Sequence, residues 1–445
     1  MKLTSLVNHA AEVLGSILKT FPEGGSVRAV PPDAVIASFF RSRKYLGSHD
    51  RRFIADSVYG TIRHLRRIDA LLAHSPRAIR ASGASADALP RVLVYLLQID
   101  DGRTEERSRE LLEAYGGDVP SESDLPRARS DGRSREPALD LADRYSFPPW
   151  MVQRFIESYG LEEAEALCRV LNTQAPMTIR VNTHKTDRSE LQRLLSTRGL
   201  ETKPTTYSPL GVIFNKRTNV FSLDAFREGM FEVQDEGSQL LPLLIDPKPT
   251  AKVLDACAGA GGKALELSAL MKNRGEILAT DISPRRLEEL RRRAKRAGAH
   301  NIRIREEDYT SPPSVDTRPS FDHVLLDAPC SGTGTIRRNP GLKWTISQES
   351  VAELVLKQVS LLSATSRYVK PGGVIWYCTC SLLRQENEGV VERFLSTESS
   401  FAILDPASLA GRLGLADAVS GSAVHLLPHR HGTDGFFCAA LQRMT

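Results

Sequence analysis

Two cysteine-containing segments hold the residues best suited to covalent chemistry in this chain of 445 residues. One reads Asp327-Ala-Pro-Cys330-Ser-Gly and the other reads Tyr377-Cys-Thr-Cys380-Ser. A thiolate that adds to C6 of a cytosine turns C5 into an enamine-like carbon, which can then take a methyl group. A carboxyl group near the base would assist by hydrogen bonding or by donating a proton, and Asp327 is the candidate for that role.

Three further cysteines fit a plainer role. A free cysteine is often a buried packing residue, and we expect this of Cys257, Cys378 and Cys438. Cys378 and Cys380 fall on the same side of an extended strand, so the loop at the strand end must distinguish them. The sequence has no Cys-x-x-Cys pair and no matched histidine cluster. We therefore expect no metal site.

A glycine-rich turn stands earlier in the same region, where the sequence reads DACAGAGGK over 255–263. Gly259, Gly261 and Ala264 fit the pattern G-x-G-x-x-A, in which backbone N–H groups can approach a ligand. A phosphate-binding P-loop would need glycine at position 257 and a hydroxyl residue at position 264. This chain has cysteine and alanine there, so the pattern excludes a P-loop.

Aspartates close the next two β-rich runs. Asp281 is placed like the carboxylate that binds ribose hydroxyls in nucleotide-binding sheets, and Asp308 could meet an adenine amino group. Either residue alone could instead cap the following helix. The spacing suits a nicotinamide dinucleotide or S-adenosylmethionine (SAM). Paired thiols at neighbouring strand ends are unusual for a dehydrogenase, which favours SAM.

These residues need a scaffold of parallel strands. From residue 236 onward, short β-rich runs alternate with helical stretches, which predicts a parallel sheet covered on both faces and a ligand site at the carboxyl ends of its strands. Residues 141–235 read as a linker helix and a small β-α-β piece. Residues 1–140 read as helices, with an arginine-rich amphipathic stretch over 50–74 and a polar linker over 117–137.

Composition limits the class of protein. Lys plus Arg is 59 against 54 for Asp plus Glu, a net charge of +5. This excludes a binder held by bulk positive charge and leaves room for local basic surfaces. The sequence shows no apolar run long enough for a membrane span, no secretory signal, and only six scattered cysteines. We expect a monomeric cytoplasmic protein without a disulfide scaffold.

The segments DACAGAGGK, DAPCSGTGTIRRNPGLKW and YCTCS resemble motifs of the RsmB/Sun-type RNA cytosine-5 methyltransferases. PMTIRVN, FREGMFEVQDEGSQL and PHRHGTDGFFCAAL extend the likeness, and VYGTIRHLRRIDALL is similar to a NusB-like RNA-binding domain. The resemblance implies an α/β protein with three domains. These are an all-α NusB-like domain at 1–140, a small α+β RNA-binding domain at 141–235, and a SAM-dependent Rossmann-like methyltransferase domain at 236–445.

The resemblance also implies roles for individual residues. It makes Cys380 the nucleophile and Cys330 the residue that assists release of the product. DNA cytosine methyltransferases use a Pro-Cys thiol, so the residues alone would favour Cys330, and the resemblance reverses that choice. The residues implied to hold SAM and orient the base are Cys257, Ala258, Gly259, Ala260, Gly261, Gly262, Lys263, Asp281, Asp308 and Asp327.

Some positions depart from the family pattern or concern RNA. Most relatives carry proline and threonine where this chain has Ala260 and Ala264, so SAM affinity is the property affected. Arg337, Arg338 and Lys343 are expected to form a strip that contacts phosphates beside the target base. The basic helix expected over 285–296 is interpreted as a solvated cover of the sheet.

Together these observations give one hypothesis and several alternatives. The hypothesis is methyl transfer from SAM to C5 of a cytosine in 16S (small-subunit) ribosomal RNA, through a covalent Cys380–C6 intermediate on a base flipped from its stack. The same chemistry on transfer RNA is the nearest alternative. A non-catalytic RNA-binding ribosome-assembly protein and a nicotinamide oxidoreductase are the competing classes.

Overall fold

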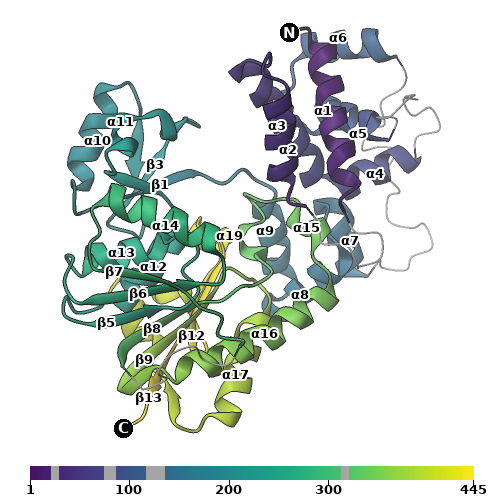
Figure 1. Cartoon of the computed structure of the whole chain (residues 1–445). Coiled ribbons are helices and arrows are strands. Elements are labelled where there is room, and N and C mark those ends of the chain that lie inside the picture. Colours follow the sequence, from purple (N-terminus) through teal and green to yellow (C-terminus); the bar gives the residue numbers. More distant parts are fainter. Residues whose placement is uncertain (22–29, 75–86, 117–135, 312–319) are drawn as a thin grey trace. The chain divides into compact units, whose positions relative to one another are not determined.

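The computed structural model describes residues 1–21, 30–74, 87–116, 136–311 and 320–445. The chain forms two compact units (Figure 1), one from residues 1–173 and 336–349 and the other from residues 174–335 and 350–445. The segment 336–349 thus interrupts the second unit in sequence and belongs to the first. Most of the polar linker predicted over 117–137 lies outside the described residues. The domain boundaries predicted at residues 140 and 235 stay predictions.

The described part of the first unit is helical. Its helices are α1 (Leu3–Leu18), α2 (Pro32–Ser42), α3 (Ser48–Arg63), α4 (Leu65–His74), α5 (Ala88–Val94), the π-helical turn η1 (Tyr95–Ile99), α6 (Glu105–Tyr115), α7 (Pro137–Tyr145), α8 (Pro149–Tyr159), α9 (Leu161–Leu171) and α15 (Leu342–Thr345). Helix α1 buries Val7, Leu14 and Ile17 at helical spacing. The amphipathic stretch over 50–74 forms two helices, as predicted.

The second unit begins with a small antiparallel sheet. Its strands are β1 (Met177–Val181), β2 (Thr202–Pro204), β3 (Gly211–Phe214) and β4 (Phe231–Val233), in the order β2-β3-β1-β4. Helix α10 (Arg188–Thr197) follows β1, and the short helices η3 (Val220–Ser222) and α11 (Asp224–Arg227) precede β4. The α10 side chains Leu191 and Leu195 pack on Ile179 and Val212 of the sheet. This is the α+β piece expected before the catalytic region.

The large sheet of the second unit contains nine strands among the described residues, in the order β11-β12-β13-β9-β8-β5-β6-β7, with β10 paired to β13. These are β5 (Lys252–Asp255), β6 (Glu276–Asp281), β7 (Ile302–Glu306), β8 (Phe321–Asp327), β9 (Val369–Thr379), β10 (Phe401–Ile403), β11 (Val419–Ser420), β12 (Ala423–Leu426) and β13 (Phe436–Arg443). The pairings from β7 to β9 are parallel, which confirms the predicted fold class. Strand β13 is antiparallel to β9.

Helices cover both faces of this sheet. Helices α12 (Glu236–Ile245), α13 (Gly262–Leu270) and α14 (Pro284–Ala297) lie on one face, while α16 (Gln348–Ser366) and α17 (Glu388–Thr397) lie on the other (Figure 1). The remaining short helices are η4 (Thr333–Thr335), η5 (Arg384–Glu386), α18 (Pro406–Gly411), η6 (Ala416–Ala418) and α19 (Pro428–His431). Val253, Ile277, Leu325 and Trp376 form the centre of the core between sheet and helices.

Parallel pairing puts the carboxyl ends of β6, β5, β8 and β9 along one edge of the sheet. The loops that leave this edge carry the predicted site residues. Among the described residues, no helix is long and apolar enough to span a membrane.

Candidate functional site

The two cysteines singled out from the sequence meet at this edge. Strands β8 and β9 are parallel neighbours, with Asp327 opposite Cys378. The loops beyond them bring the Sγ atoms of Cys330 and Cys380 to 3.4 Å from each other. Both side chains are half-buried. The contact with Cys380, together with burial, raises the pKa of the Cys330 thiol, which favours the protonated form of Cys330.

Cys378 has a different environment although it is only two residues from Cys380. It is fully buried, and its Sγ lies 3.4 Å from that of Cys438 across the β9–β13 pair. Burial raises the pKa of the Cys378 thiol. Cys378 and Cys438 therefore pack in the core, whereas the chain leaves the strand after Thr379 and presents Cys380 in a loop.

An ion pair lies beside the cysteines. Lys263, at the start of α13, donates from Nζ to Oδ2 of Asp327 at 2.5 Å. Burial disfavours the charged ammonium, but the Asp327 carboxylate outweighs it and raises the pKa of Lys263. The pair connects the glycine-rich turn with the end of β8. In this pair the Asp327 side chain is the hydrogen-bond acceptor.

The glycine-rich turn has the backbone that the sequence pattern requires. Gly259 and Gly261 have φ values of 54° and 82°, a region that favours glycine. A Cβ at Gly261 would lie 2.0 Å from Cδ1 of Leu290, whereas Cβ atoms at Gly259 and Gly262 would meet no atom within 4 Å. The turn is thus tight against α14 on one side and open at two glycines.

The two strand-end aspartates differ in surroundings. Asp281 is buried, and its two carboxylate oxygens accept from the backbone N–H of Gly259 at 3.0 Å and of Ser283 at 2.8 Å. Asp308 is exposed, and the hydroxyl and the backbone N–H of Thr310 lower its pKa by donating to it. Asp281 thus shapes the turn directly. The predicted SAM contact of Asp308 stays a prediction.

Asp255, at the end of β5, was not among the predicted site residues. It is 1% exposed, and within the described part of the chain neither carboxyl oxygen has a hydrogen-bond partner. Burial, reinforced by the nearby Asp327 carboxylate, raises the pKa of Asp255 to about 7. Burial disfavours the ionised form of this carboxyl far more than the protonated form. The stability of the folded protein should therefore depend on pH through Asp255.

We expect the free energy of unfolding of the wild type to fall as the pH rises, and we expect Asp255→Asn to make this fall smaller. The unfolded chain releases the Asp255 proton near pH 4, whereas the folded protein keeps it up to about pH 7. The stabilising contribution is therefore complete below about pH 4 and is lost as the pH rises to about 7. Between about pH 5 and pH 8 the unfolding free energy of the wild type should fall by about 3 kcal/mol more than that of the variant. Urea titrations at both pH values measure this, and parallel curves would contradict it.

Sequence reasoning missed Glu386, which lies in η5 directly after the Cys380 loop. Glu386 is fully buried. Its carboxylate accepts from the backbone N–H and the hydroxyl of Ser331, from the hydroxyl of Ser381 and from Nε2 of Gln358, at 2.8, 2.5, 2.5 and 3.0 Å. It therefore joins the residue after Cys330 to the residue after Cys380. The acidic and amide run from Gln385 to Glu388 was the only signal in the sequence.

The three basic residues predicted to contact RNA lie in the segment that belongs to the first unit. Lys343 is fully buried and donates from Nζ to the backbone oxygens of Arg63 and Ser146 and to Oδ1 of Asn172, at 3.0, 2.9 and 2.5 Å. This burial contradicts the predicted phosphate contact of Lys343. Arg337 is 9% exposed and Arg338 is half-buried. For these two residues, RNA contact stays a prediction.

We expect Lys343→Met to lower the free energy of unfolding by about 2–3 kcal/mol, because buried oxygen acceptors lose their donor. Denaturant titration measures the effect. Lys357→Met, at an exposed position of α16, is the control and should change stability by less than about 0.5 kcal/mol. If Lys343→Met instead leaves stability unchanged and makes RNA binding less dependent on salt, the predicted contact between Lys343 and a phosphate would be correct.

Comparisons with known proteins agree with this architecture. A family described as 16S rRNA methyltransferase RsmB/F matches residues 242–442, and a ferredoxin-like domain of RsmF/B-like methyltransferases matches residues 147–221. The crystal structure of PH0851 has a TM-score of 0.77 at 25% identity and covers 98% of this chain and 99% of its own. The structure of NSun6 from Pyrococcus horikoshii with SFG has a TM-score of 0.59 at 22% identity, covers 68% of this chain and 99% of its own, and shares the fold.

Relatives of known name match most of the chain. The probable ribosomal RNA small subunit methyltransferase B of Synechocystis is 32% identical over 89% of this chain and 92% of its own length. Ribosomal RNA small subunit methyltransferase B of Pseudomonas syringae is 33% identical over 88% and 89%. A 28S rRNA (cytosine-C(5))-methyltransferase of Mus musculus is 32% identical over 72% of this chain and 42% of its own length.

Proposed function

Because the chain belongs to the RsmB/F family of rRNA methyltransferases, we propose that it methylates C5 of a cytosine in 16S rRNA through a covalent bond between Cys380 and C6. The observation that carries the proposal is the pair of thiols, 3.4 Å apart, at the ends of two adjacent strands. The names of the bacterial relatives support small-subunit rRNA as the substrate.

SAM is the methyl donor of this family, and its bound sulfonium supplies the electrophilic methyl group. The residues present fit this cofactor. The turn over 257–263 is open at Gly259 and Gly262, and Asp281 lies beside it. We propose that the turn and Asp281 hold the nucleoside and methionine parts, with Asp308 at the adenine and Asp327 near the base.

The side chains of the chain divide the remaining work. The Cys380 sulfur would form a bond to C6, which makes C5 nucleophilic, and C5 would then take the methyl group. Asp327, which is paired with Lys263, would accept a hydrogen bond from the cytosine amino group. A base must then remove the C5 proton, and the C6–sulfur bond breaks as Cys380 leaves as a thiolate. The raised pKa of Cys330 suits a thiol that assists this release step and leaves the first attack to Cys380.

The other parts of the chain would bind RNA. We propose that the NusB-like helices over 1–140 and the small domain over 141–235 recognise structured RNA partly by shape. We further propose that residues 236–445 carry the chemistry, and that the enzyme acts as a cytoplasmic monomer without a metal.

The proposal is tested by incubating the protein with SAM labelled in the methyl group and with naked 16S rRNA, assembled small subunits, 23S rRNA or transfer RNA. We expect label in small-subunit rRNA, at one cytosine that resists bisulfite conversion. Label confined to transfer RNA would overturn the substrate. SAM binding without label in any RNA would favour the non-catalytic assembly protein.

A further inference from the structure

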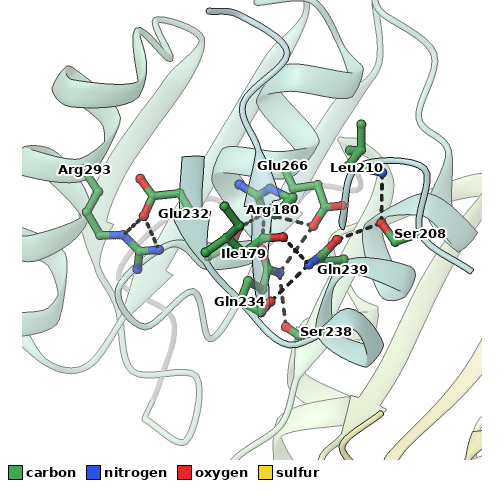
Figure 2. A network of polar contacts seen from close by, with 11 residues as sticks. Ile179, Arg180, Ser208, Leu210, Glu232, Gln234, Ser238, Gln239, Glu266 and Arg293 are labelled. Atoms are coloured by element: carbon green, nitrogen blue, oxygen red, sulfur yellow. Dashed lines mark hydrogen bonds and ion pairs between the residues drawn. The ribbon is translucent and has the colours of Figure 1, made fainter. Parts of the chain in front are cut away.

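A buried polar network joins the small sheet to the helices beside the cofactor turn (Figure 2). Arg180 of β1 and Glu266 of α13 are 3% and 0% exposed at their side chains and are paired at 2.9 Å. Gln234, just after β4, bonds to both of them. Gln239 of α12 donates to the backbone oxygens of Ile179 and Gln234 at 3.3 and 3.0 Å. The small domain is therefore anchored to the catalytic sheet by oriented, desolvated bonds.

A second buried ion-pair cluster joins β4 of the small sheet to α14. Glu232 of β4, whose side chain is 4% exposed, accepts from Nε and Nη2 of Arg293 at 3.2 and 3.0 Å. It also pairs with Arg296. The basic helix was expected to be a solvated cover of the sheet, and most of its arginines are exposed. Arg293 and Arg296 instead turn inward to one buried carboxylate.

One arginine of each ion pair also donates a hydrogen bond to the backbone of the cofactor turn. Nη1 of Arg180 donates to the backbone oxygen of Gly262 at 2.8 Å, and Nη1 of Arg293 donates to that of Ala260 at 2.7 Å. A carbonyl and the N–H of the next residue share one planar peptide. Fixing the two carbonyls therefore fixes the directions of the N–H groups of Gly261 and Lys263.

Three backbone N–H groups restrain the turn locally: those of Ala258, Gly259 and Gly261 donate to the backbone oxygen of Thr280, to Asp281 and to the backbone oxygen of Ala258. Residues 257–263 include three glycines and no proline, and glycine loses the most conformational freedom when it is ordered. Further restraint comes from contacts on the carbonyl side of the turn. The two arginines supply it, because each is held in place by a buried carboxylate.

We propose that the small domain sets the affinity for SAM in two ways, through Arg180 of β1 and through Glu232 of β4, which holds Arg293 of α14. Arg180 and Arg293 act as positioning residues for the backbone of the turn. The inference rests on the proposed function, since SAM is the ligand concerned. Loss of one arginine would leave the turn folded but less ordered, so that SAM binding must order it.

The test compares Arg293→Met with Arg296→Met by calorimetric titration with SAM. Both variants remove an arginine from Glu232, but only Arg293 donates to a carbonyl of the turn among the contacts of the described residues. We expect Arg293→Met to raise the dissociation constant for SAM about tenfold. Arg296→Met should change it by less than about twofold. The KM for SAM should rise in Arg293→Met, while kcat at saturating SAM stays within about threefold.

A double variant covers the second ion pair. Arg180→Met with Glu266→Met removes both buried charges together, so neither is left unpaired, and SAM binding should again weaken about tenfold. If Arg293→Met and the double variant both bind SAM as tightly as the wild type, the inference is wrong, but the proposed function stands. A loss of affinity in Arg296→Met equal to that in Arg293→Met would also overturn it. Absence of SAM binding by the wild type would overturn the proposed function as well.

Discussion

Replacing Cys380 with alanine is expected to abolish methyl transfer to RNA, with a loss of at least about 1,000-fold. Cys380 lies in the loop after β9, where its sulfur is half-buried beside Cys330. Without this sulfur no bond to C6 can form, and C5 of cytosine is too weak a nucleophile to take the methyl group. Labelled SAM and substrate RNA measure the rate, and SAM titration checks that the cofactor site is intact.

Cys330→Ala is expected to fail at a later step. The proposed nucleophile Cys380 remains, so the bond to C6 should form, but release should be impaired and a covalent protein–RNA adduct should accumulate. A denaturing gel detects it as a species of reduced mobility that disappears when Cys380 is also replaced. Cys378→Ala is the matched control, because it removes a thiol from the buried core in β9, two residues before Cys380. It should keep methyl transfer within about threefold.

Other outcomes would reassign the two thiols. Retained transfer in Cys380→Ala, with an adduct in that variant, would make Cys330 the nucleophile. This is the choice that the Pro-Cys segment favoured from the residues alone. Equal and complete loss in both variants without any adduct would contradict the separate release role of Cys330.

Glu386→Ala is expected to lower both the rate of methyl transfer and the stability of the protein. The carboxylate is buried and holds Ser331 and Ser381, which follow the two cysteines. Removing it leaves buried N–H and O–H groups without an acceptor, which should reduce the free energy of unfolding by about 3 kcal/mol. A shift of either thiol by about 1 Å should reduce kcat about 100-fold. Urea titration and single-turnover methyl transfer measure the two effects.

Glu392→Gln is the matched control for Glu386. Glu392 is 62% exposed at its side chain and pairs with Arg384 at 3.0 Å. Such a pair should contribute less than about 1 kcal/mol, and the control should keep its activity. Glu386→Gln keeps the shape of the side chain, so it should regain part of the lost rate. Lower stability with kcat unchanged would show that Glu386 only supports the fold.

Much of the fold could be predicted from local patterns. The β-rich runs that end at Asp255, Asp281 and Asp327 indicated parallel strands, because apolar runs separated by helices must pair within one covered sheet. The parallel strand pairs confirm this. The same reasoning put both cysteines at one edge, since parallel strands end on the same side.

Contacts between distant segments could not be predicted in the same way. Lys343 reads as a basic residue in a surface loop, yet its ammonium is enclosed by oxygens from Arg63, Ser146 and Asn172. Arg293 has the same sequence context as its exposed neighbours on α14, yet it faces Glu232 from β4. The residue type alone does not show whether a charged side chain is exposed to solvent or buried against a partner.

The sequence by itself determined the fold class, the family and the order of the chemistry-bearing residues along the chain. These follow from periodicity and from short motifs, which are local properties. Only the tertiary structure decided which charges are buried, that Glu386 joins the two cysteine loops, and that two arginines hold the cofactor turn. The physical reason is desolvation. The energy of a charge depends on the partners that packing brings to it, and those partners come from elements far away in the sequence.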